Sequence, residues 1–306
     1  MSFLQNPMKT TEIKTVKHLE TVLNTKIEVI HNIIENIDKF YYERKEAKLD
    51  KKGNIKIKNG QPQYRIIHPS QGELKILQTA IHKRILSKIT LPINVKGGVK
   101  GNDNISNAKV HQGNKFKFVT DLENFYPSVS YEEVVKMFIR NGFSKKIAII
   151  LSRLTTFNNF LPQGTPTSGS IANLVFVPID LVLLDICKQN TLTYTRYVDD
   201  LSFSSKIDFQ YHCNTIIETI IKMGFKISRK KTFYKSGKIE ITGVIVGNNS
   251  IHSPQRVNDK IKSLKESTKV NDEISNTQKG LENYANRIKK LSKTQIKDIP
   301  QKNSSL

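Results

Sequence analysis

The chain has 306 residues, of which 37% are hydrophobic, enough to bury a sizeable core in one large domain or two to three smaller ones. Its 49 Lys and Arg residues against 27 Asp and Glu give a formal net charge of +22, which favours a polyanionic partner. Nucleic acid is the leading candidate, and an anionic membrane surface is the alternative. No apolar run approaches transmembrane length, and the start of the chain lacks the apolar block of a signal peptide. We therefore expect a cytoplasmic protein without a membrane partner. The spacing of Cys187 and Cys213 matches neither a zinc site nor a disulfide framework.

The first hundred residues predict helices on either side of a short basic hairpin. Apolar residues recur at helical spacing within 11–48, which predicts a helical arm over 1–50. Alternation and two glycine turns predict a small basic hairpin over 51–60, and helical spacing returns over 74–89. A glycine-rich loop follows over 97–107.

The middle of the chain alternates strands with helices. Residues 117–122 read as a buried strand that ends at an acidic side chain, and two helices are expected after it, over 131–141 and 145–154. A turn-rich loop over 161–170 leads into the apolar run 171–186, which is a buried helix rather than a membrane span because it is short and carries two aspartates.

Tyr197-Val198-Asp199-Asp200 places two adjacent carboxylates between runs that read as β-strands. This pattern predicts a hairpin with Asp199 and Asp200 at its tip. Like charges raise one another's pKa unless a cation neutralises them, so the pair suits divalent metal ions with oxygen ligands. An ordinary aspartate-containing turn is the commoner use of an isolated pair, and the pair alone does not decide between the two.

The last third of the chain becomes progressively more basic. Helical spacing over 209–223 is followed by a basic strand over 224–232 and a further strand over 239–246. Beyond Ser253 there are 12 Lys and Arg against 6 Asp and Glu, which indicates a basic helical module able to hold a nucleic-acid duplex through its phosphates. The final residues, 301–306, are expected to be disordered.

Four motifs in this order resemble the palm motifs of reverse transcriptases: Asp121-x-x-x-Phe125-Tyr126, Leu161-Pro162-Gln163-Gly164-x-Pro166-x-Ser168, Tyr197-x-Asp199-Asp200, and Gly224 followed by Lys231-Thr232. Within that superfamily the chain resembles the retron enzymes, through Asn107-Ala108-x-x-His111, Ile241-Thr242-Gly243 and the fingers-like segment 64–78. The resemblance spans about 55–250. Two departures are Ile241, where the family usually has Val, and Gly169, where many members have Pro; neither touches a carboxylate.

The resemblance implies an α+β right-hand polymerase, with an antiparallel palm sheet and a helical C-terminal thumb. Its parts would be the N-terminal helical arm over 1–50, fingers over 51–114 and 128–160, palm over 115–127 and 161–250, and a basic helical thumb over 251–306.

Nucleotide addition is an in-line displacement in which two Mg²⁺ ions stabilise both the attacking and the leaving oxygen. Asp121 and Asp199 are the expected bridging ligands, with Asp200 beside them. By resemblance, the backbone carbonyl of Leu122 completes one coordination sphere, and Mn²⁺ is a possible substitute metal.

The resemblance also assigns residues to the binding of the incoming nucleotide and of the RNA. Tyr126 would exclude a ribose 2′-hydroxyl, Gln163 and Gly164 would shape the nucleotide pocket, Arg65 would clamp the triphosphate and Lys231 would face the leaving pyrophosphate. A core aromatic is the competing interpretation of Tyr126, and a solvated charge that of Lys231. The candidate RNA-binding residues are Asn107, His111, Thr242 and Gly243, although a hydrogen-bonded structural histidine is the stronger interpretation of His111.

By resemblance, the function is RNA-directed DNA synthesis from deoxynucleoside triphosphates on a cognate structured noncoding RNA. Synthesis would be primed at a 2′-hydroxyl, would leave a branched RNA–DNA product, and would act with an effector protein in anti-phage defence; the oligomeric state is open. One alternative is an antiviral reverse transcriptase that makes untemplated or protein-primed DNA. Another is a noncatalytic RNA-binding scaffold, against which the three intact aspartates argue.

Overall fold

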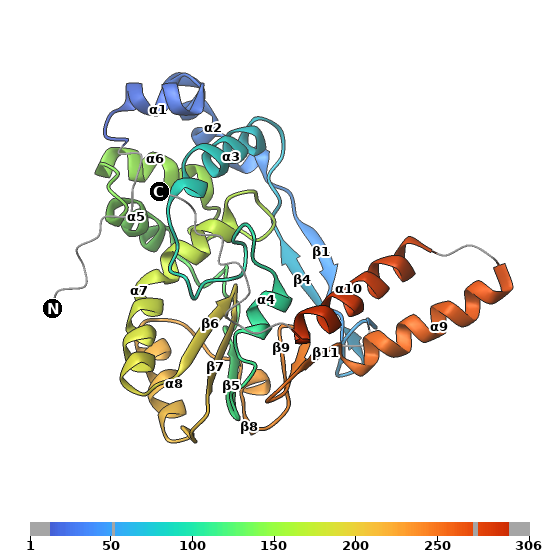
Figure 1. Cartoon of the computed structure of the whole chain (residues 1–306). Coiled ribbons are helices and arrows are strands. Elements are labelled where there is room, and N and C mark those ends of the chain that lie inside the picture. The colour runs from blue at the N-terminus through green and yellow to red at the C-terminus, as the bar shows by residue number, and fades with distance from the viewer. Residues whose placement is uncertain (1–12, 51–52, 272–274, 294–306) are drawn as a thin grey trace. The chain divides into compact units, whose positions relative to one another are not determined.

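The structure, a computed structural model, describes residues 13–50, 53–271 and 275–293 (Figure 1). The chain divides into two compact units. The first unit combines Met1–Pro92 with Asn124–Pro178, and the second combines Ile93–Glu123 with Ile179–Leu306. Each unit is therefore built from two separate stretches of sequence. The predicted boundaries of fingers, palm and thumb stay a prediction.

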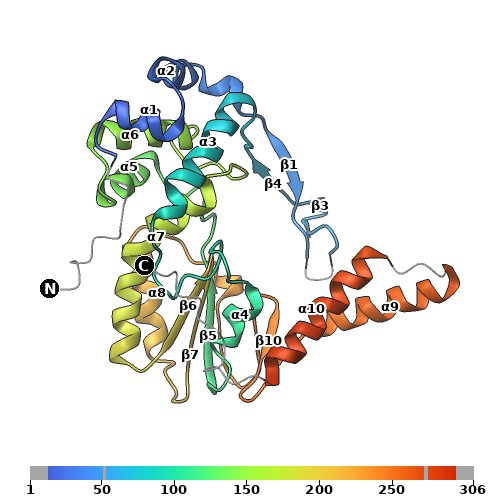
Figure 2. The ribbon, with the colours of Figure 1, turned by 45° about the horizontal axis from the view of Figure 1, so that its top comes forward.

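The first unit begins with helices α1 (Val16–Leu23) and α2 (Ile27–Glu35) and the 3-10 helix η1 (Ile37–Phe40). The helical arm that we predicted over 1–50 is wrong beyond Phe40, because β1 (Arg44–Ala47) pairs antiparallel with β4 (Tyr64–Ile67). Figure 2 shows these two strands side by side, extending away from the helices of this unit. Residues 1–12 of the predicted arm lie outside the described residues.

The predicted basic hairpin exists but lies closer to the C-terminus than expected. Strands β2 (Ile57–Lys58) and β3 (Gln61–Pro62) flank Asn59 and Gly60, both of which have positive φ angles. Two central residues with positive φ define the turn type whose twist matches a hairpin. Helix α3 (Gly72–Arg84) and the 3-10 helix η2 (Leu86–Lys88) confirm the helical spacing over 74–89.

Helices α5 (Tyr131–Arg140) and α6 (Lys145–Thr155) confirm the next two predicted helices. Helix α7 (Ser168–Gln189) is longer than its predicted range, and by length and composition alone it is apolar enough to cross a membrane. Our argument that this run is too short was therefore wrong. However, 61% of the most apolar stretch of α7 is buried inside the protein and Asp180 is fully buried, as in a core helix.

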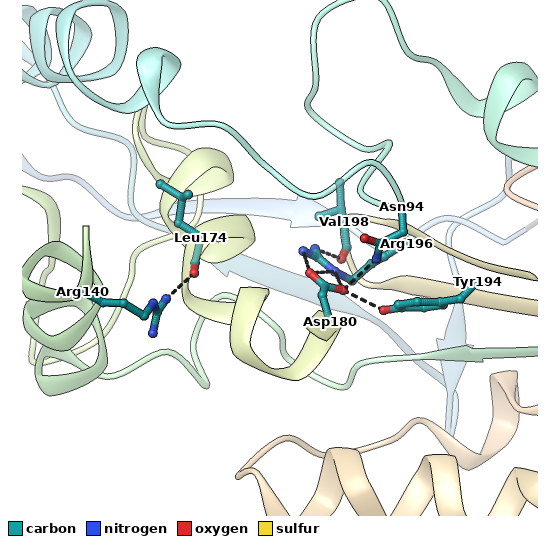
Figure 3. Close-up of polar contacts among 7 residues, drawn as sticks. All are labelled: Asn94, Arg140, Leu174, Asp180, Tyr194, Arg196 and Val198. Carbon is teal, nitrogen blue, oxygen red and sulfur yellow. Dashed lines mark hydrogen bonds and ion pairs between the residues drawn. The ribbon is translucent and has the colours of Figure 1, made fainter. Parts of the chain in front are cut away.

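Helix α7 carries Pro178 in its interior. Proline has no backbone N–H, so the carbonyl four residues earlier, that of Leu174, loses its helical partner. Arg140 replaces it, since its Nη2 donates to the Leu174 carbonyl oxygen at 2.7 Å (Figure 3). A side chain from α5 thus donates the hydrogen bond that the Leu174 carbonyl cannot receive from Pro178 within α7.

The second unit is centred on a four-stranded antiparallel sheet of order β6-β7-β5-β8. Its strands are β5 (Phe116–Asp121), β6 (Thr193–Tyr197), β7 (Asp200–Ser205) and β8 (Phe233–Ser236). Helix α8 (His212–Lys222) confirms the helix predicted over 209–223. The basic strand predicted over 224–232 is wrong: this stretch makes only a bridge from Ile227 to Leu122, and then forms the 3-10 helix η3 (Arg229–Lys231).

A second, three-stranded sheet contains β9 (Ile239–Ile241), β10 (Val244–Val246) and β11 (Ile251–His252). Its core also includes residues of helix α4 (Asn104–Lys109) and of the C-terminal helix α10 (Asn276–Lys293). Figure 2 shows α4 beside β10 and α10. The loop predicted over 97–107 thus ends early, because Asp103 forms a capping box with Ser106 and starts a helix.

The predicted basic helical module is confirmed as two helices, α9 (Gln255–Asn271) and α10. The predicted disorder of 301–306 lies outside the described residues.

The contact between Arg140 and Leu174 predicts that the effects of substituting Arg140 and Pro178 on stability are coupled. Arg140→Met should lower the free energy of unfolding by about 1 kcal/mol, because the Leu174 carbonyl then has no donor. In a Pro178→Ala background the restored N–H supplies that donor, so the same substitution should cost less. Urea unfolding of the four variants in a double-mutant cycle measures the difference. Equal costs in the two backgrounds would contradict this account.

Candidate active site

The register of the larger sheet brings the three predicted carboxylates together. Asp121, the last residue of β5, lies opposite Asp200, the first residue of β7. The backbone N–H of Leu122 donates to the carbonyl of Asp199 at 2.9 Å, which fixes the β6–β7 turn beside the end of β5. Tyr197 pairs with Asp200, so the turn consists of Val198 and Asp199. Our placement of Asp200 at the hairpin tip was therefore wrong by one position.

Electrostatic repulsion marks this group of carboxylates. Asp121 is only 5% exposed. Burial, and after it the neighbouring charges of Asp199 and Asp121, together raise the pKa of Asp200 to about 7. Lys231 offsets part of this negative charge, since its Nζ lies 2.6 Å from Oδ2 of Asp121. Burial opposes the charge on Lys231, but its hydrogen bond to Asp121 and the three carboxylates raise its pKa.

The donor set suits a hard divalent cation, because it offers only carboxylate oxygens whose mutual repulsion a cation would relieve. Within 13–50, 53–271 and 275–293, no three His, Cys, Asp or Glu side chains converge closely enough to form a ready-made metal cage. The positive charge nearest to Asp121 is instead the Lys231 ammonium group. A metal bound here would therefore compete with Lys231 for Asp121. The roles predicted for the Leu122 carbonyl and for Lys231 at the pyrophosphate stay predictions.

Four predicted nucleotide-binding residues belong to the first unit. Arg65 on β4 has a side chain that is 47% exposed, and its Nε lies 3.7 Å from Oε2 of Glu46. The carbonyl of Gln163 accepts a hydrogen bond from the N–H of His68 at 2.9 Å. Gly164 has a φ of 105°, and a Cβ there would lie 3.3 Å from Pro69. The loop that carries Gln163 and Gly164 thus packs on the residues that follow β4.

Tyr126 is half-buried, and its ring centroid lies 5.8 Å from that of the buried Phe125. Part of Tyr126 therefore remains exposed. The structure supports both interpretations of Tyr126 from the sequence, as a packed aromatic and as a residue that contacts substrate.

The predicted RNA-binding residues have internal partners. Asn107 on α4 is fully buried, and its Nδ2 donates to Oγ1 of Thr242 at 3.2 Å. Thr242 and Gly243 form the β9–β10 turn, where both have positive φ, and the Gly243 carbonyl accepts from the hydroxyl of Tyr284 on α10. These contacts tie α4, the second sheet and α10 together.

His111 is also fully buried, between the hydroxyl groups of Ser204 and Thr195, each 2.7 Å from one ring nitrogen. Burial, together with the charge of Lys117, lowers the pKa of His111 to about 3, so the imidazole is neutral. Direct RNA contact by Asn107 or His111 would require these side chains to be uncovered. The structure instead gives them a role in holding the sheet and α4 in place, as the structural interpretation of His111 expects.

Sequence reasoning missed three residues that shape the β6–β7 turn: Gly97, Asp180 and Arg196. Gly97 lies so close to the turn that a Cβ would be 2.4 Å from the Val198 nitrogen. Asp180 and Arg196 form an ion pair whose side chains are 0% exposed. One signal was present in the sequence, because a charge inside the apolar run 171–186 needs a buried partner.

The raised pKa of Asp200 predicts how stability depends on pH. The ordinary pKa of aspartate is about 3.9, so the folded state binds more protons than the unfolded state between about pH 4 and pH 7, and stability falls as pH rises through that window. In a chelator, Asp200→Asn should therefore melt a few degrees higher than the parent at pH 8, with a smaller gap at pH 5.

Asp208 provides a control of opposite sign. Its pKa is lowered by hydrogen bonds from the Tyr234 hydroxyl and the Gln210 N–H, so Asp208→Asn should not raise the melting temperature at pH 8. A melting gap for Asp200→Asn that does not change between pH 5 and pH 8 would show that burial and the neighbouring charges do not destabilise the ionised carboxylate.

Comparison with known proteins matches residues 50–246 to the reverse transcriptase (RNA-dependent DNA polymerase) family. The Retron Se72 reverse transcriptase of Salmonella heidelberg is 34% identical over 194 residues, covering 60% of this chain and 51% of that relative. The Retron Ec86 reverse transcriptase of Escherichia coli is 29% identical over 201 residues, covering 64% and 63%. The chain thus spans about half to two thirds of the length of these curated relatives.

A solved structure, apo telomerase from Candida tropicalis truncated from its C-terminal domain, aligns over 74% of this chain and 59% of that chain, at 10% identity. Its TM-score of 0.43 is too low to carry an argument. The sequence matches confirm the resemblance to retron enzymes that the motifs predicted. Since the family match covers well over half of the chain, the protein belongs to the reverse transcriptase family and has the right-hand polymerase fold of that family.

Proposed function

We propose that the chain is an RNA-directed DNA polymerase of the retron type. The observation that carries the proposal is the β5–β7 register, which sets Asp121 opposite Asp200 with Asp199 in the adjoining turn. The sequence similarity to Retron Se72 and Retron Ec86 reverse transcriptases supports the retron assignment. In this assignment the larger sheet is the palm, β1 to β4 belong to the fingers, and α9 with α10 is the thumb.

Asp121, Asp199 and Asp200 would hold two divalent metal ions, which we take to be Mg²⁺. When bound, these ions would lower the pKa of the attacking hydroxyl and neutralise charge on the leaving group. Asp121 and Asp199 would be shared ligands, with Asp200 beside them, and the Leu122 carbonyl would add a neutral oxygen. Lys231, whose ammonium group is now paired with Asp121 and is exposed, would contact the pyrophosphate once Asp121 serves a metal.

The first unit would supply the contacts to the incoming deoxynucleoside triphosphate. Arg65 leaves its contact with Glu46 and binds the phosphates, because a guanidinium group binds two phosphate oxygens at once. Gln163 and Gly164 shape the floor of the nucleotide pocket, and Tyr126 lies against the sugar and excludes a 2′-hydroxyl.

The proposed template is a cognate structured noncoding RNA, part of which is copied into DNA from a 2′-hydroxyl. Asn107, His111, Thr242 and Gly243 would serve this RNA by fixing the surface formed by α4, the β9–β10 turn and α10. The excess of lysine and arginine would bind the duplex through its phosphates. An effector protein and a cytoplasmic location in anti-phage defence complete the proposal.

The decisive experiment isolates the chain together with its bound nucleic acid. The chain is expressed with the DNA that flanks its gene, purified, and its nucleic acid is treated with RNase and then with debranching enzyme. We expect DNA of one defined sequence that keeps a short RNA remnant and loses it only on debranching. Unbranched DNA of random sequence would instead favour an untemplated antiviral polymerase.

Asp199→Asn should abolish DNA synthesis while leaving the amount of bound RNA within about twofold, because the side chain contacts metal and not RNA. Asp185, an exposed aspartate on α7, gives the matched control, since Asp185→Asn should synthesise as the parent does. Continued synthesis by Asp199→Asn would refute the metal assignment.

Tyr126 gives a test of sugar selection. Tyr126→Ala opens space next to the sugar, so the preference for deoxynucleotides over ribonucleotides, measured as a ratio of kcat/KM, should fall at least about tenfold. Phe138→Leu is the control, because Phe138 is buried on α5 of the first unit and should affect stability but not this ratio. An unchanged ratio for Tyr126→Ala would leave Tyr126 as a packing residue only.

A further inference from the structure

The turn that carries Asp199 holds a backbone conformation that its own sequence disfavours. Val198 has a φ of 60°, in the left-handed region. Branching at Cβ makes that conformation costly for valine, and such strain persists only where surrounding structure enforces it. Neither Val198 nor Asp199 is a glycine, so the turn must be held from outside.

The first restraint is the guanidinium group of Arg196. Its Nη1 donates to the carbonyl oxygen of Val198 at 3.0 Å, while its Nη2 donates to Oδ2 of Asp180 at 2.7 Å and its Nε to Oδ1 at 3.0 Å (Figure 3). The carbonyl of Val198 belongs to the peptide group that joins it to Asp199. Arg196 therefore grips the peptide immediately before the metal-binding carboxylate.

Asp180 in turn fixes the plane of the guanidinium group. Its Oδ1 also accepts from the Tyr194 hydroxyl at 2.8 Å and from Nδ2 of Asn94 at 3.3 Å. Both side chains of the pair are 0% exposed. Burial opposes the charge on Arg196, but the charge and hydrogen bonds of Asp180 raise its pKa above the ordinary value, so it stays ionised. A buried pair with this many donors has one geometry rather than several.

The second restraint comes from the segment 94–97. The Arg196 backbone N–H donates to the Asn94 carbonyl at 2.9 Å, and the Lys96 N–H donates to the Arg196 carbonyl at 2.8 Å. These bonds bring Gly97 against the turn, where a Cβ would lie 2.4 Å from the nitrogen of Val198 and 2.7 Å from its Cγ2. Only glycine allows the backbone to approach so closely.

We propose that Arg196 is a positioning residue for catalysis: locked by Asp180 and supported by Gly97, it sets the peptide of Val198 so that Asp199 meets the metal ions with Asp121 and Asp200. The inference deepens the proposed function and rests on it. It states that Gly97, Asp180 and Arg196, which lie outside the motifs quoted above, contribute to the affinity of the site for metal ions.

The chemistry of the side chain explains why arginine is required. A guanidinium group spans Asp180 and the Val198 carbonyl with three nitrogen atoms in one plane. A lysine ammonium group at the same place can pair with Asp180 but cannot hold both partners in that geometry. Arg196→Lys therefore keeps the buried charge and removes the grip on the turn.

The test compares two variants that reach the turn from different sides, Arg196→Lys and Gly97→Ala. Each should raise the Mg²⁺ concentration for half-maximal DNA synthesis roughly 10- to 100-fold, the usual effect of losing a group that orients a metal ligand. The KM for deoxynucleotide at saturating Mg²⁺ should change much less. Arg140→Lys is the matched control, because Arg140 also donates to a backbone carbonyl but should leave the Mg²⁺ dependence unchanged.

A pair-removal variant separates positioning from stability. Asp180→Leu, Arg196→Met and Tyr194→Phe together replace the buried ion pair, and the hydroxyl group that donates to it, by apolar side chains, a change that often leaves stability intact. We expect its melting temperature to stay near that of the parent while its Mg²⁺ requirement remains raised. Parent-like Mg²⁺ dependence in this variant or in Arg196→Lys would overturn the inference.

A binding measurement makes the test independent of polymerase activity. Mg²⁺ should raise the melting temperature of the parent protein, and half of that rise should require roughly 10- to 100-fold more Mg²⁺ in Arg196→Lys. If the parent makes no DNA but shows the Mg²⁺-dependent rise, the proposed function fails and this comparison still decides the inference. If the rise has the same midpoint in both proteins, the inference fails even where the parent makes DNA.

Discussion

The antiparallel register of β5 and β7 is the constraint on which the rest of the second unit depends. It sets Asp121 opposite Asp200, so backbone hydrogen bonds force together charges that would otherwise separate. Folding therefore buries these carboxylates and sets them against one another, and both effects raise the pKa of Asp200, while the Lys231 ammonium group lies against Asp121. The surrounding structure supplies the restraints that keep the carboxylates where their own electrostatics oppose them.

Local sequence patterns were sufficient for the elements that meet at this site. The strand ending at Asp121, the hairpin before Asp200 and the helix over 171–186 all follow from periodicity over a few residues. The contacts between elements were out of reach, because the pairing of Asp180 with Arg196 depends on how α7 meets β6. Short segments were also assigned wrongly where tertiary partners decide: residues 44–47 form a strand only because β4 lies beside them.

The motifs that suggested retron enzymes have a structural meaning that their sequence did not reveal. Both ring nitrogens of the buried His111 have partners, and a buried polar group that is satisfied in only one arrangement favours that arrangement over others. Asn107 adds a hydrogen bond from its Nδ2 to Thr242. Thr242 is held by α4, since its hydroxyl donates to the Asn104 carbonyl at 3.1 Å. Motifs far apart in the chain thus converge on α4 and its neighbours, and His111 links this junction to strands β6 and β7.

That junction also determines when the second unit can be completed. Tyr284 of α10 accepts a hydrogen bond from Asn104, and Ile288 packs in one core with Ile105 and Ala108, across about 180 residues of chain. Closing so long a loop costs entropy that only the finished core repays. During synthesis on the ribosome, all four strands of the sheet that holds the carboxylates are therefore made before the core around α4 can close, because that core needs residues of α10.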